Sequence, residues 1–240
     1  MIWKWKSLYW IVVYAMILGA VWFAGTNGVD AVMTMMSDER LPERICVIID
    51  AGHGGVDGGT TSCTGVAESH LNLEMSLRLD DFLHLLGVNT KMIRTTDCSV
   101  YTSGESIAAK KISDLKERVR IVETTENGVL LSIHQNYFQQ SVYSGAQVFF
   151  SRNPKSQMLA EQLQANIIAT LNRGSKRNAK KANGIYLMEK VTRPAVLVEC
   201  GFLSNPAEES LLRSEDYQKK LCVVIGCTIS NFVNSGSPIT

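Results

Sequence analysis

The sequence lacks three features that would each narrow its function: an excess of charge of one sign, an internal repeat and a block of strongly biased composition. Its 240 residues carry 24 Lys and Arg against 23 Asp and Glu, which leaves a formal net charge of +1. The totals therefore give no electrostatic reason to expect nucleic acid as a partner. No segment recurs, and nothing in the composition predicts a long disordered region. Beyond a distinct N-terminal segment, about 200 residues remain, which is enough for one domain with a full hydrophobic core.

The six cysteines contain no Cys-x-x-Cys pair. In an exported protein six cysteines could pair in 15 ways. However, Cys46 and Cys200 lie in apolar runs that are typical of buried strands, and Cys222 and Cys227 point in different directions on an expected helix. We therefore expect buried free thiols for most of them.

The N-terminal segment, residues 1–40, combines positive charge with a long apolar stretch. Lys4 and Lys6 precede an uncharged apolar run over residues 8–24, and the first acidic residue is Asp30. This pattern is typical of an export signal or a membrane anchor, whereas a buried core helix seldom opens a chain behind two lysines. Small residues at 29–31 offer a cleavage site that lies late after the apolar run. We expect an uncleaved anchor that places the following domain outside the cytoplasm.

Over residues 41–240 short apolar runs alternate with longer amphipathic segments. The runs have strand length, and the longer segments repeat apolar residues at three- and four-residue spacing, which predicts helices. Strands that alternate with helices predict an α/β fold, here a single domain with a mainly parallel, twisted sheet flanked by helices. In such a sheet ligands bind at the carboxyl ends of the strands. The expected strands are 45–49, 88–93, 129–133, 146–150, 185–188 and 195–198, and the expected helices are 68–86, one from about 113, 158–171 and 221–232.

Two of only four histidines follow expected strands directly. His53 stands in a glycine-rich loop after the first strand, His134 ends the third, and Glu68 opens the first helix. Two imidazoles and a carboxylate that leave one position open form a ligand set that catalytic zinc uses. Each residue also has a structural interpretation, since Glu68 favours a helix N-terminus and histidines often only satisfy hydrogen bonds. Their joint position at strand and helix ends favours a metal site, whereas His70 and His84 are expected to face solvent or the rim.

An isolated carboxylate ends the expected strand over residues 195–198. Glu199 follows four apolar residues, where a carboxylate is costly unless it meets a metal, a base or a hydrogen-bond donor. Beside a metal-activated water it would serve as the general base, which takes the proton of the water and later returns one to the leaving amine. The alternative is a glutamate that only caps the turn after the strand.

Several motifs occur together in the order found in one protein family. They resemble the zinc-dependent N-acetylmuramoyl-L-alanine amidases of amidase family 3, from about Cys46 to the end of the last helix. The motifs are Val47-Ile48-Ile49-Asp50-Ala51-Gly52-His53-Gly54-Gly55-Val56-Asp57-Gly58-Gly59, Glu68 with Leu71-Asn72-Leu73, Arg94-Thr95-Thr96-Asp97, Leu115 with Arg118, Ser132-Ile133-His134 with Asn136, and Val198-Glu199-Cys200-Gly201-Phe202 with Ser204-Asn205.

The resemblance implies a zinc cofactor, a ligand set and a reaction. In the family, zinc is held by the histidine of the first motif, the glutamate that opens the first helix and the histidine after the third strand. These correspond to His53, Glu68 and His134, and the catalytic glutamate of the family corresponds to Glu199. The implied reaction is hydrolysis of the amide that joins the lactyl group of N-acetylmuramic acid to the L-alanine of the stem peptide.

Two positions depart from the family pattern. Gln135 stands where a small residue is usual, and Cys63, in the loop before the first helix, could compete as a soft zinc ligand. We expect no wall-binding repeat module after the catalytic domain. A short, anchored, single-domain member of this family is similar to the germination-specific amidases of spore-forming bacteria, which help to make muramic-δ-lactam in the spore cortex. We therefore expect an exported protein, anchored or secreted to the cell wall or spore cortex space, that acts in cortex maturation for germination.

The expected partners are the peptidoglycan substrate, the membrane through the N-terminal segment, and an exported accessory protein that positions the domain. Basic residues over 173–181 could attract the carboxylates of peptidoglycan or simply form a solvated loop. Two other functions stay open from the residues alone. One is a zinc peptidase that acts on the stem peptide, and the other is a non-catalytic, anchored wall-binding protein, against which Glu199 argues.

Overall fold

The structure is a computed structural model, and it describes residues 45–235. The expected signal or anchor segment, and the expected boundary after residue 40, lie outside these residues. Within 45–235 no helix is both long enough and apolar enough to cross a membrane.

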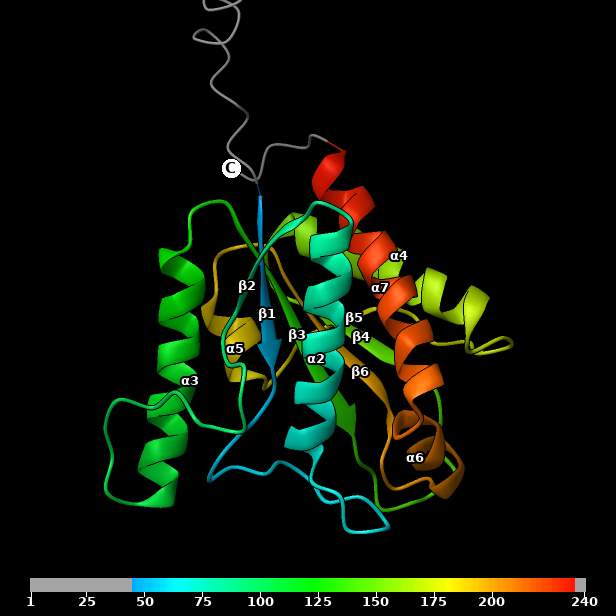
Figure 1. Cartoon of the computed structure of the whole chain (residues 1–240), viewed down its shortest axis with the longest axis horizontal. Coiled ribbons are helices and arrows are strands. Elements are labelled where there is room, and N and C mark those ends of the chain that lie inside the picture. The colour runs from blue at the N-terminus through cyan, green and yellow to red at the C-terminus, as the bar shows by residue number, and fades with distance from the viewer. Residues whose placement is uncertain (1–44, 236–240) are drawn as a thin grey trace, which may run out of the picture. The chain divides into compact units, whose positions relative to one another are not determined.

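The described chain alternates strands and helices, as expected (Figure 1). The strands are β1 (Cys46–Ala51), β2 (Asn89–Met92), β3 (Gly128–Asn136), β4 (Gln147–Phe150), β5 (Lys180–Lys181) and β6 (Ala195–Phe202). The helices are α2 (Glu68–Leu85), α3 (Ile107–Thr124), α4 (Pro154–Thr170), α5 (Tyr186–Lys190), α6 (Pro206–Leu212) and α7 (Glu215–Asn234).

One sheet of six strands organises the domain, in the order β2-β1-β3-β6-β4-β5. Four of its pairings are parallel, and only β4 runs antiparallel to its neighbour β6. The expected mainly parallel α/β sheet is therefore confirmed. Because β1, β3 and β6 are adjacent and parallel, their carboxyl ends meet at one edge of the sheet, where ligands of such folds bind.

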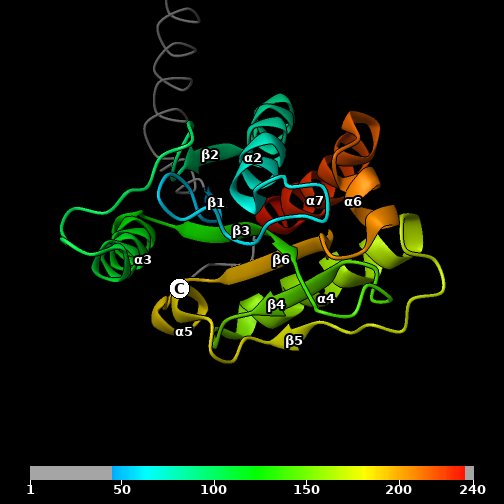
Figure 2. The ribbon, with the colours of Figure 1, turned by 90° about the horizontal axis from the view of Figure 1, so that it is seen from below.

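Helices cover both faces of this sheet (Figures 1 and 2). Helices α2, α4 and α7 pack on one face, and α3 and α5 pack on the other. Strands covered on both faces are apolar throughout. Accordingly, alternate residues of β1 belong to different cores, with Val47 and Ile49 facing α2 and α7 while Ile48 faces α3 and α5.

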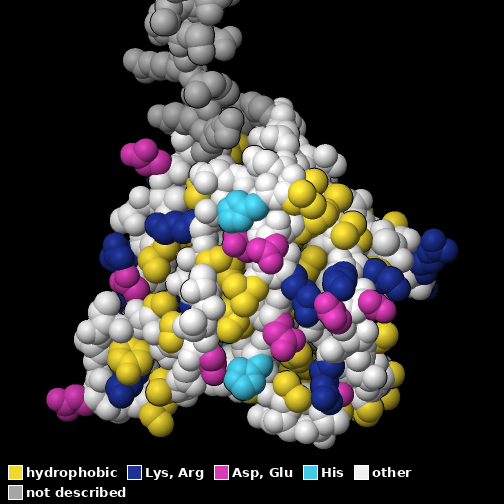
Figure 3. Space-filling view, in the orientation of Figure 1, with side chains coloured by type: hydrophobic (Ala, Val, Ile, Leu, Met, Phe, Trp, Pro, Cys, Tyr) yellow, Lys and Arg dark blue, Asp and Glu magenta, His cyan; other side chains and the backbone are white. Residues whose placement is uncertain are grey.

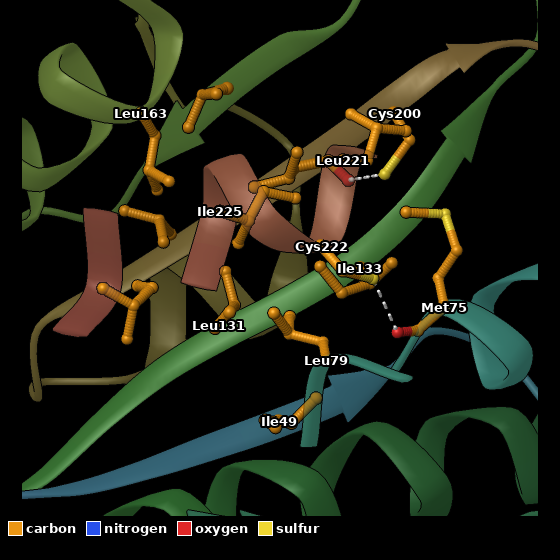
Figure 4. Close-up of a cluster of buried hydrophobic side chains, with 14 of the residues drawn as sticks. Ile49, Met75, Leu79, Leu131, Ile133, Leu163, Cys200, Leu221, Cys222 and Ile225 are labelled. Carbon is orange, nitrogen blue, oxygen red and sulfur yellow. Dashed lines mark hydrogen bonds between the residues drawn. The ribbon is translucent and has the colours of Figure 1, made fainter. Parts of the chain in front are cut away.

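Two cysteines lie inside the larger core (Figure 4). The thiol of Cys200 contacts the carbonyl of Val198 at 3.8 Å, and that of Cys222 contacts the carbonyl of Met75 at 3.6 Å. All six cysteines are free, and Cys46 is buried as well, whereas the three others are exposed. The expectation of free thiols is confirmed, but burial applies to only half of them. On the surface, acidic and basic side chains are intermingled over the face that α2 and α7 present (Figure 3).

Some expected elements differ from those observed. The apolar run at 185–188 is not a strand, because Tyr186–Lys190 forms the short helix α5. Helix α3 begins at Ile107, well before Ser113, since the side chain of Ser106 caps it by accepting from the backbone N–H of Ala109 at 3.2 Å. Strand β5 and helix α6 were not expected from the apolar pattern.

Candidate active site

Three side chains meet at the carboxyl edge of the sheet. His53 follows β1, His134 lies near the end of β3, and Glu68 is the first residue of α2. Each offers one ligand atom, and these atoms all lie within 4.8 Å of one another. The structure therefore brings together the three residues that the sequence singled out.

The carboxylate of Glu68 lies between the two imidazole rings. Its Oε1 is 3.0 Å from Nδ1 of His134, and its Oε2 is 3.3 Å from Nε2 of His53. The two rings lie edge to face with their centroids 5.0 Å apart. Two imidazole nitrogens and a carboxylate oxygen that converge in this way can hold a divalent metal such as zinc.

The electrostatics of this cluster fit a cation-binding site. Burial alone would favour neutral His53, but the carboxylates of Glu68 and Asp57 outweigh it and raise the pKa of His53 to about 9. Burial would likewise raise the pKa of Glu68, but hydrogen bonds from His134 and His53 and their positive charge lower it well below its usual range. The site therefore keeps a buried carboxylate ionised and favours positive charge next to it.

Glycines leave the space that the cluster occupies. A Cβ at Gly52 would lie 2.2 Å from Nε2 of His134, so only glycine admits the imidazole ring there. Gly59 has a φ of +69°, and a Cβ there would lie 2.6 Å from Oε2 of Glu68. His53 itself has a φ of +61°, which is uncommon for a residue with a side chain and costs of order 1 kcal/mol or more. The loop therefore holds His53 in a conformation that it would not adopt alone.

Surrounding hydrogen bonds orient two of the three side chains, His53 and Glu68. Asp57 Oδ2 is 2.9 Å from Nδ1 of His53 and leaves Nε2 directed at Glu68. Asn72 donates to Glu68 Oε1 at 3.2 Å, and the backbone and hydroxyl of Thr60 donate to Glu68 Oε2 at 3.0 and 3.2 Å. Sequence reasoning assigned no role to Asp57, Asn72 or Thr60. Such partners fix the orientation of metal-binding side chains.

Glu199 lies beside the cluster, on β6. Its backbone is paired in register with His134 on the neighbouring strand β3. Its Oε2 is shielded from solvent and has no hydrogen-bond partner within residues 45–235. Burial raises the pKa of Glu199 to about 7, with repulsion from Glu68 adding to this effect and the two histidines opposing it. A buried carboxylate that has no partner among the described residues, next to a cluster of potential metal ligands, is suited to accept a proton.

The remaining residues of interest lie outside the cluster. His70 and His84 are more than half exposed, as expected, and bond to Asp97 and Thr90. Cys63 is exposed and is not part of the cluster. Gln135 is buried under it, and its backbone N–H donates to Glu68 Oε1 at 3.2 Å.

Comparisons with known proteins agree with this geometry. The model of the Amidase_3 family, N-acetylmuramoyl-L-alanine amidase, matches residues 47–231, which include every residue of the site. The chain belongs to this family. The amidase therefore hydrolyses the bond between N-acetylmuramic acid and L-alanine in peptidoglycan, a polymer that lies outside the cytoplasm.

Individual relatives match the amidase over most of its length. It is 34% identical to the germination-specific N-acetylmuramoyl-L-alanine amidase of Bacillus subtilis over 195 residues. The aligned region covers 80% of this chain and 81% of the relative. The solved CwlD amidase of Clostridioides difficile, in complex with the GerS lipoprotein, is 32% identical with a TM-score of 0.76, over 80% of this chain and 99% of that one. An N-acetylmuramoyl-L-alanine amidase from Clostridium difficile 630 is 28% identical with a TM-score of 0.70, over 81% and 99%.

Proposed function

We propose that the protein is a zinc-dependent amidase in which His53, Glu68 and His134 hold the metal and Glu199 is the general base. The observation that carries this proposal is the convergence of three ligand atoms within 4.8 Å beside a buried carboxylate oxygen that has no partner among the described residues. Zinc bound there would polarise the scissile carbonyl and make water acidic enough to attack it at neutral pH. Hydrogen bonds between Asp57 and His53, and from Asn72 and Thr60 to Glu68, already orient two of the side chains that would hold it.

Glu199 supplies the proton transfers. Its Oε2 accepts the proton of the attacking water, and the protonated carboxyl then donates one to the nitrogen of L-alanine as the amide breaks. The products are a peptide with a free L-alanine amino terminus and a glycan strand with a free lactyl carboxylate. Cleavage within the stem peptide would yield neither product, so product analysis separates an amidase from a zinc peptidase.

A role in the spore cortex is the finer part of the proposal. Its support is the relative from Bacillus subtilis that is described as germination-specific and shares 34% identity over four-fifths of both chains. Removal of stem peptides from muramic acid is the step that muramic-δ-lactam formation requires first. We propose that the protein prepares cortex glycan in this way, anchored by residues 1–40. The solved relative in complex with a lipoprotein supports an exported accessory partner here too.

Paired variants test the metal and the base separately. We expect Glu199→Gln to keep zinc, measured by elemental analysis, but to lose at least ~100-fold in turnover on peptidoglycan. His134→Ala should lose both zinc and activity, whereas His70→Ala, which removes an exposed histidine of α2, should retain both. Full zinc content in His134→Ala would refute the ligand set, and near-normal turnover in Glu199→Gln would reduce that residue to a structural role. Mass spectrometry of the wild-type digest should show the new L-alanine amino terminus.

A further inference from the structure

The loop between β3 and β4 exposes a group of aromatic rings. It begins directly after Asn136, and it places Phe138 at 49% and Tyr143 at 41% exposure, with Tyr137 and Val142 also exposed. About half of the surface of Phe138 and more than a third of that of Tyr143 is open to solvent. When large exposed apolar side chains gather in one place they mark a binding surface more often than an accident of folding. Phe138 and Tyr143 are called the aromatic platform below.

The rings of the platform are ordered by one another and by the sheet beneath. Phe138 and Tyr143 lie edge to face with centroids 4.9 Å apart, and Tyr143 in turn lies 6.1 Å from the ring of Phe202 on β6. The guanidinium of Arg177 covers Phe202 at 5.1 Å. Edge-to-face aromatic pairs of this kind are favourable beyond their buried area. The exposed rings therefore rest on a stack that reaches into the molecule.

Backbone hydrogen bonds hold the same loop in place. The N–H of Phe138 donates to Oγ of Ser204 at 3.1 Å, and the side-chain amide of Asn205 donates to the carbonyl of Tyr143 at 3.2 Å. The buried carboxylate of Glu208 accepts from the last turn of the loop at 2.8 Å. A surface that is fixed before its ligand arrives loses less conformational entropy on binding.

The platform lies next to the catalytic cluster along the same two strands. Phe138 follows His134 by four residues, a span of at most ~14 Å, and Phe202 follows Glu199 by three. Strands β3 and β6 stay paired beyond the cluster, since Asn136 is opposite Phe202. A polymer whose cleaved bond lies between His134 and Glu199 can therefore reach the platform with a neighbouring unit.

The chemistry of the loop suits a sugar better than a protein. Pyranose rings present flat C–H faces that stack on aromatic rings, and they carry hydroxyl groups around the edge. Within residues 45–235 no group bonds the hydroxyl of Tyr143, so it is available to a sugar hydroxyl. The tip of the loop, Gln139 to Ser141, is polar and exposed, so its amide and hydroxyl groups can form hydrogen bonds with sugar hydroxyls beside the rings.

We propose that Phe138 and Tyr143 form a saccharide subsite that stacks on a pyranose of the neighbouring disaccharide in the glycan strand, beyond the disaccharide whose muramic acid carries the cleaved amide. This inference rests on the proposed function for the position of the cleaved bond. It makes the platform a determinant of specificity for polymeric glycan over a single disaccharide. It also lets the catalytic domain bind the glycan strand directly.

Binding to peptide-free glycan tests the subsite without requiring zinc or hydrolysis. The full chain is titrated calorimetrically with an oligomer of three N-acetylglucosamine–N-acetylmuramic acid repeats. We expect Phe138→Ala and Tyr143→Ala each to weaken binding at least ~5-fold, and Tyr143→Phe, which keeps the ring, to weaken it less. Leu85→Ala is the matched control, because Leu85 is 80% exposed but lies at the far end of α2.

Kinetics on two substrates test the same subsite in the reaction. For peptide-bearing strands of several disaccharides, Tyr143→Ala should raise KM at least ~5-fold with a smaller effect on kcat, and the rise should be smaller for a single-disaccharide muropeptide. Phe138→Leu, which keeps apolar bulk without a ring, should behave like Phe138→Ala if stacking is responsible. Thermal unfolding checks that each variant is folded.

Two outcomes would overturn the proposal and indicate that the rings bind a protein partner. One is glycan binding by both alanine variants that equals wild type, and the other is an equal loss of binding in Leu85→Ala. Ring-dependent glycan binding by a protein that holds no zinc would overturn the proposed function but not the subsite.

Discussion

Gly52 is required by a neighbouring side chain and not by its own backbone angles. A methyl group there would lie 2.2 Å from Nε2 of His134, so the imidazole ring would have to move. We expect Gly52→Ala to weaken zinc binding by at least ~10-fold, because displaced ligands lose their geometry. Zinc affinity measured by competition with a chelator gives the number.

Gly58 provides the control in the same loop. A Cβ at Gly58 would lie 3.8 Å from that of Ala67, which is an ordinary contact. Gly58→Ala should therefore bind zinc like the wild type. An equal loss in both variants would show that the loop is sensitive to any substitution and that the ring of His134 is not the cause.

The sequence predicted the position of the proposed metal ligands better than that of the residues that support them. His53, Glu68 and His134 could be found because each stands at the end of a recognisable element. Asp57 and Thr60 could not, because their role depends on how the loop after β1 folds back on α2. The positive φ of His53 could not be predicted from the sequence either. Glycine is a common signal of a positive φ, whereas histidine is not.

At the scale of elements, short apolar runs were the main source of error. The run Ile185 to Met188 has four residues, a length at which a buried strand and a buried helical turn have the same pattern. It forms part of α5, which packs between α3 and β6. Helix α6 lacked periodicity too, but Asn205 followed by Pro206 is a helix start that could have been recognised, and Asn205 does cap it.

One buried ion pair joins helix α3 to strand β1. Arg118 on α3 binds Asp50 at the end of β1, and its Nε also donates to Asp114 at 2.6 Å. Burial would raise the pKa of Asp50, but the charge of Arg118 and the hydroxyl of Ser132 outweigh it and keep that pKa below its ordinary value. A carboxyl whose pKa is lower in the folded state stabilises the fold above its unfolded pKa of ~3.9 and loses this effect as pH falls.

Replacing Asp50 tests this link. Asp50→Asn leaves Arg118 buried without its charged partner, so we expect the free energy of unfolding to fall by about 3–5 kcal/mol between pH 5 and 7. The difference from wild type should shrink below about pH 4, where the Asp50 carboxyl of the unfolded wild-type chain takes up a proton while that of the folded chain still resists it. Urea unfolding at a series of pH values measures both quantities. A difference that stays constant down to pH 2.5 would contradict the assignment of the pH dependence to Asp50.

For the whole molecule, the alternation of strands and helices predicted the class of fold and the edge at which the site lies. The antiparallel direction of β4 could not be derived, because it depends on the path of the loop that carries the aromatic platform. This reversal determines what lies beside the site. A connection between β3 and β4 that turns back at the carboxyl edge leaves its exposed rings beside the site, where a crossover helix would have covered them.

The proposed metal also links distant parts of the chain. Its ligands at positions 53, 68 and 134 belong to three elements, so zinc binds the folded state in preference to the unfolded one. At a hundredfold excess over the dissociation constant this stabilises the fold by ~2.7 kcal/mol, which corresponds to a rise in Tm of roughly 5–10 °C. Calorimetry of the full chain after chelation and after return of zinc measures the shift. The Tm of His134→Ala should not rise when zinc is returned. A wild-type Tm that is the same with and without zinc would contradict the proposed metal site.

The six free thiols determine how the domain can mature outside the cytoplasm. Secreted domains that are too small to build a sufficient core depend on disulfides, but this one buries a core on both faces of its sheet and uses none. Cys200 and Cys222 are enclosed there, and burial raises the pKa of both thiols, so little reactive thiolate forms. Folding after export therefore needs no disulfide among residues 45–235, and the thiols inside the core are protected from oxidation, whereas those of Cys63, Cys98 and Cys227 are exposed to the redox potential of the compartment.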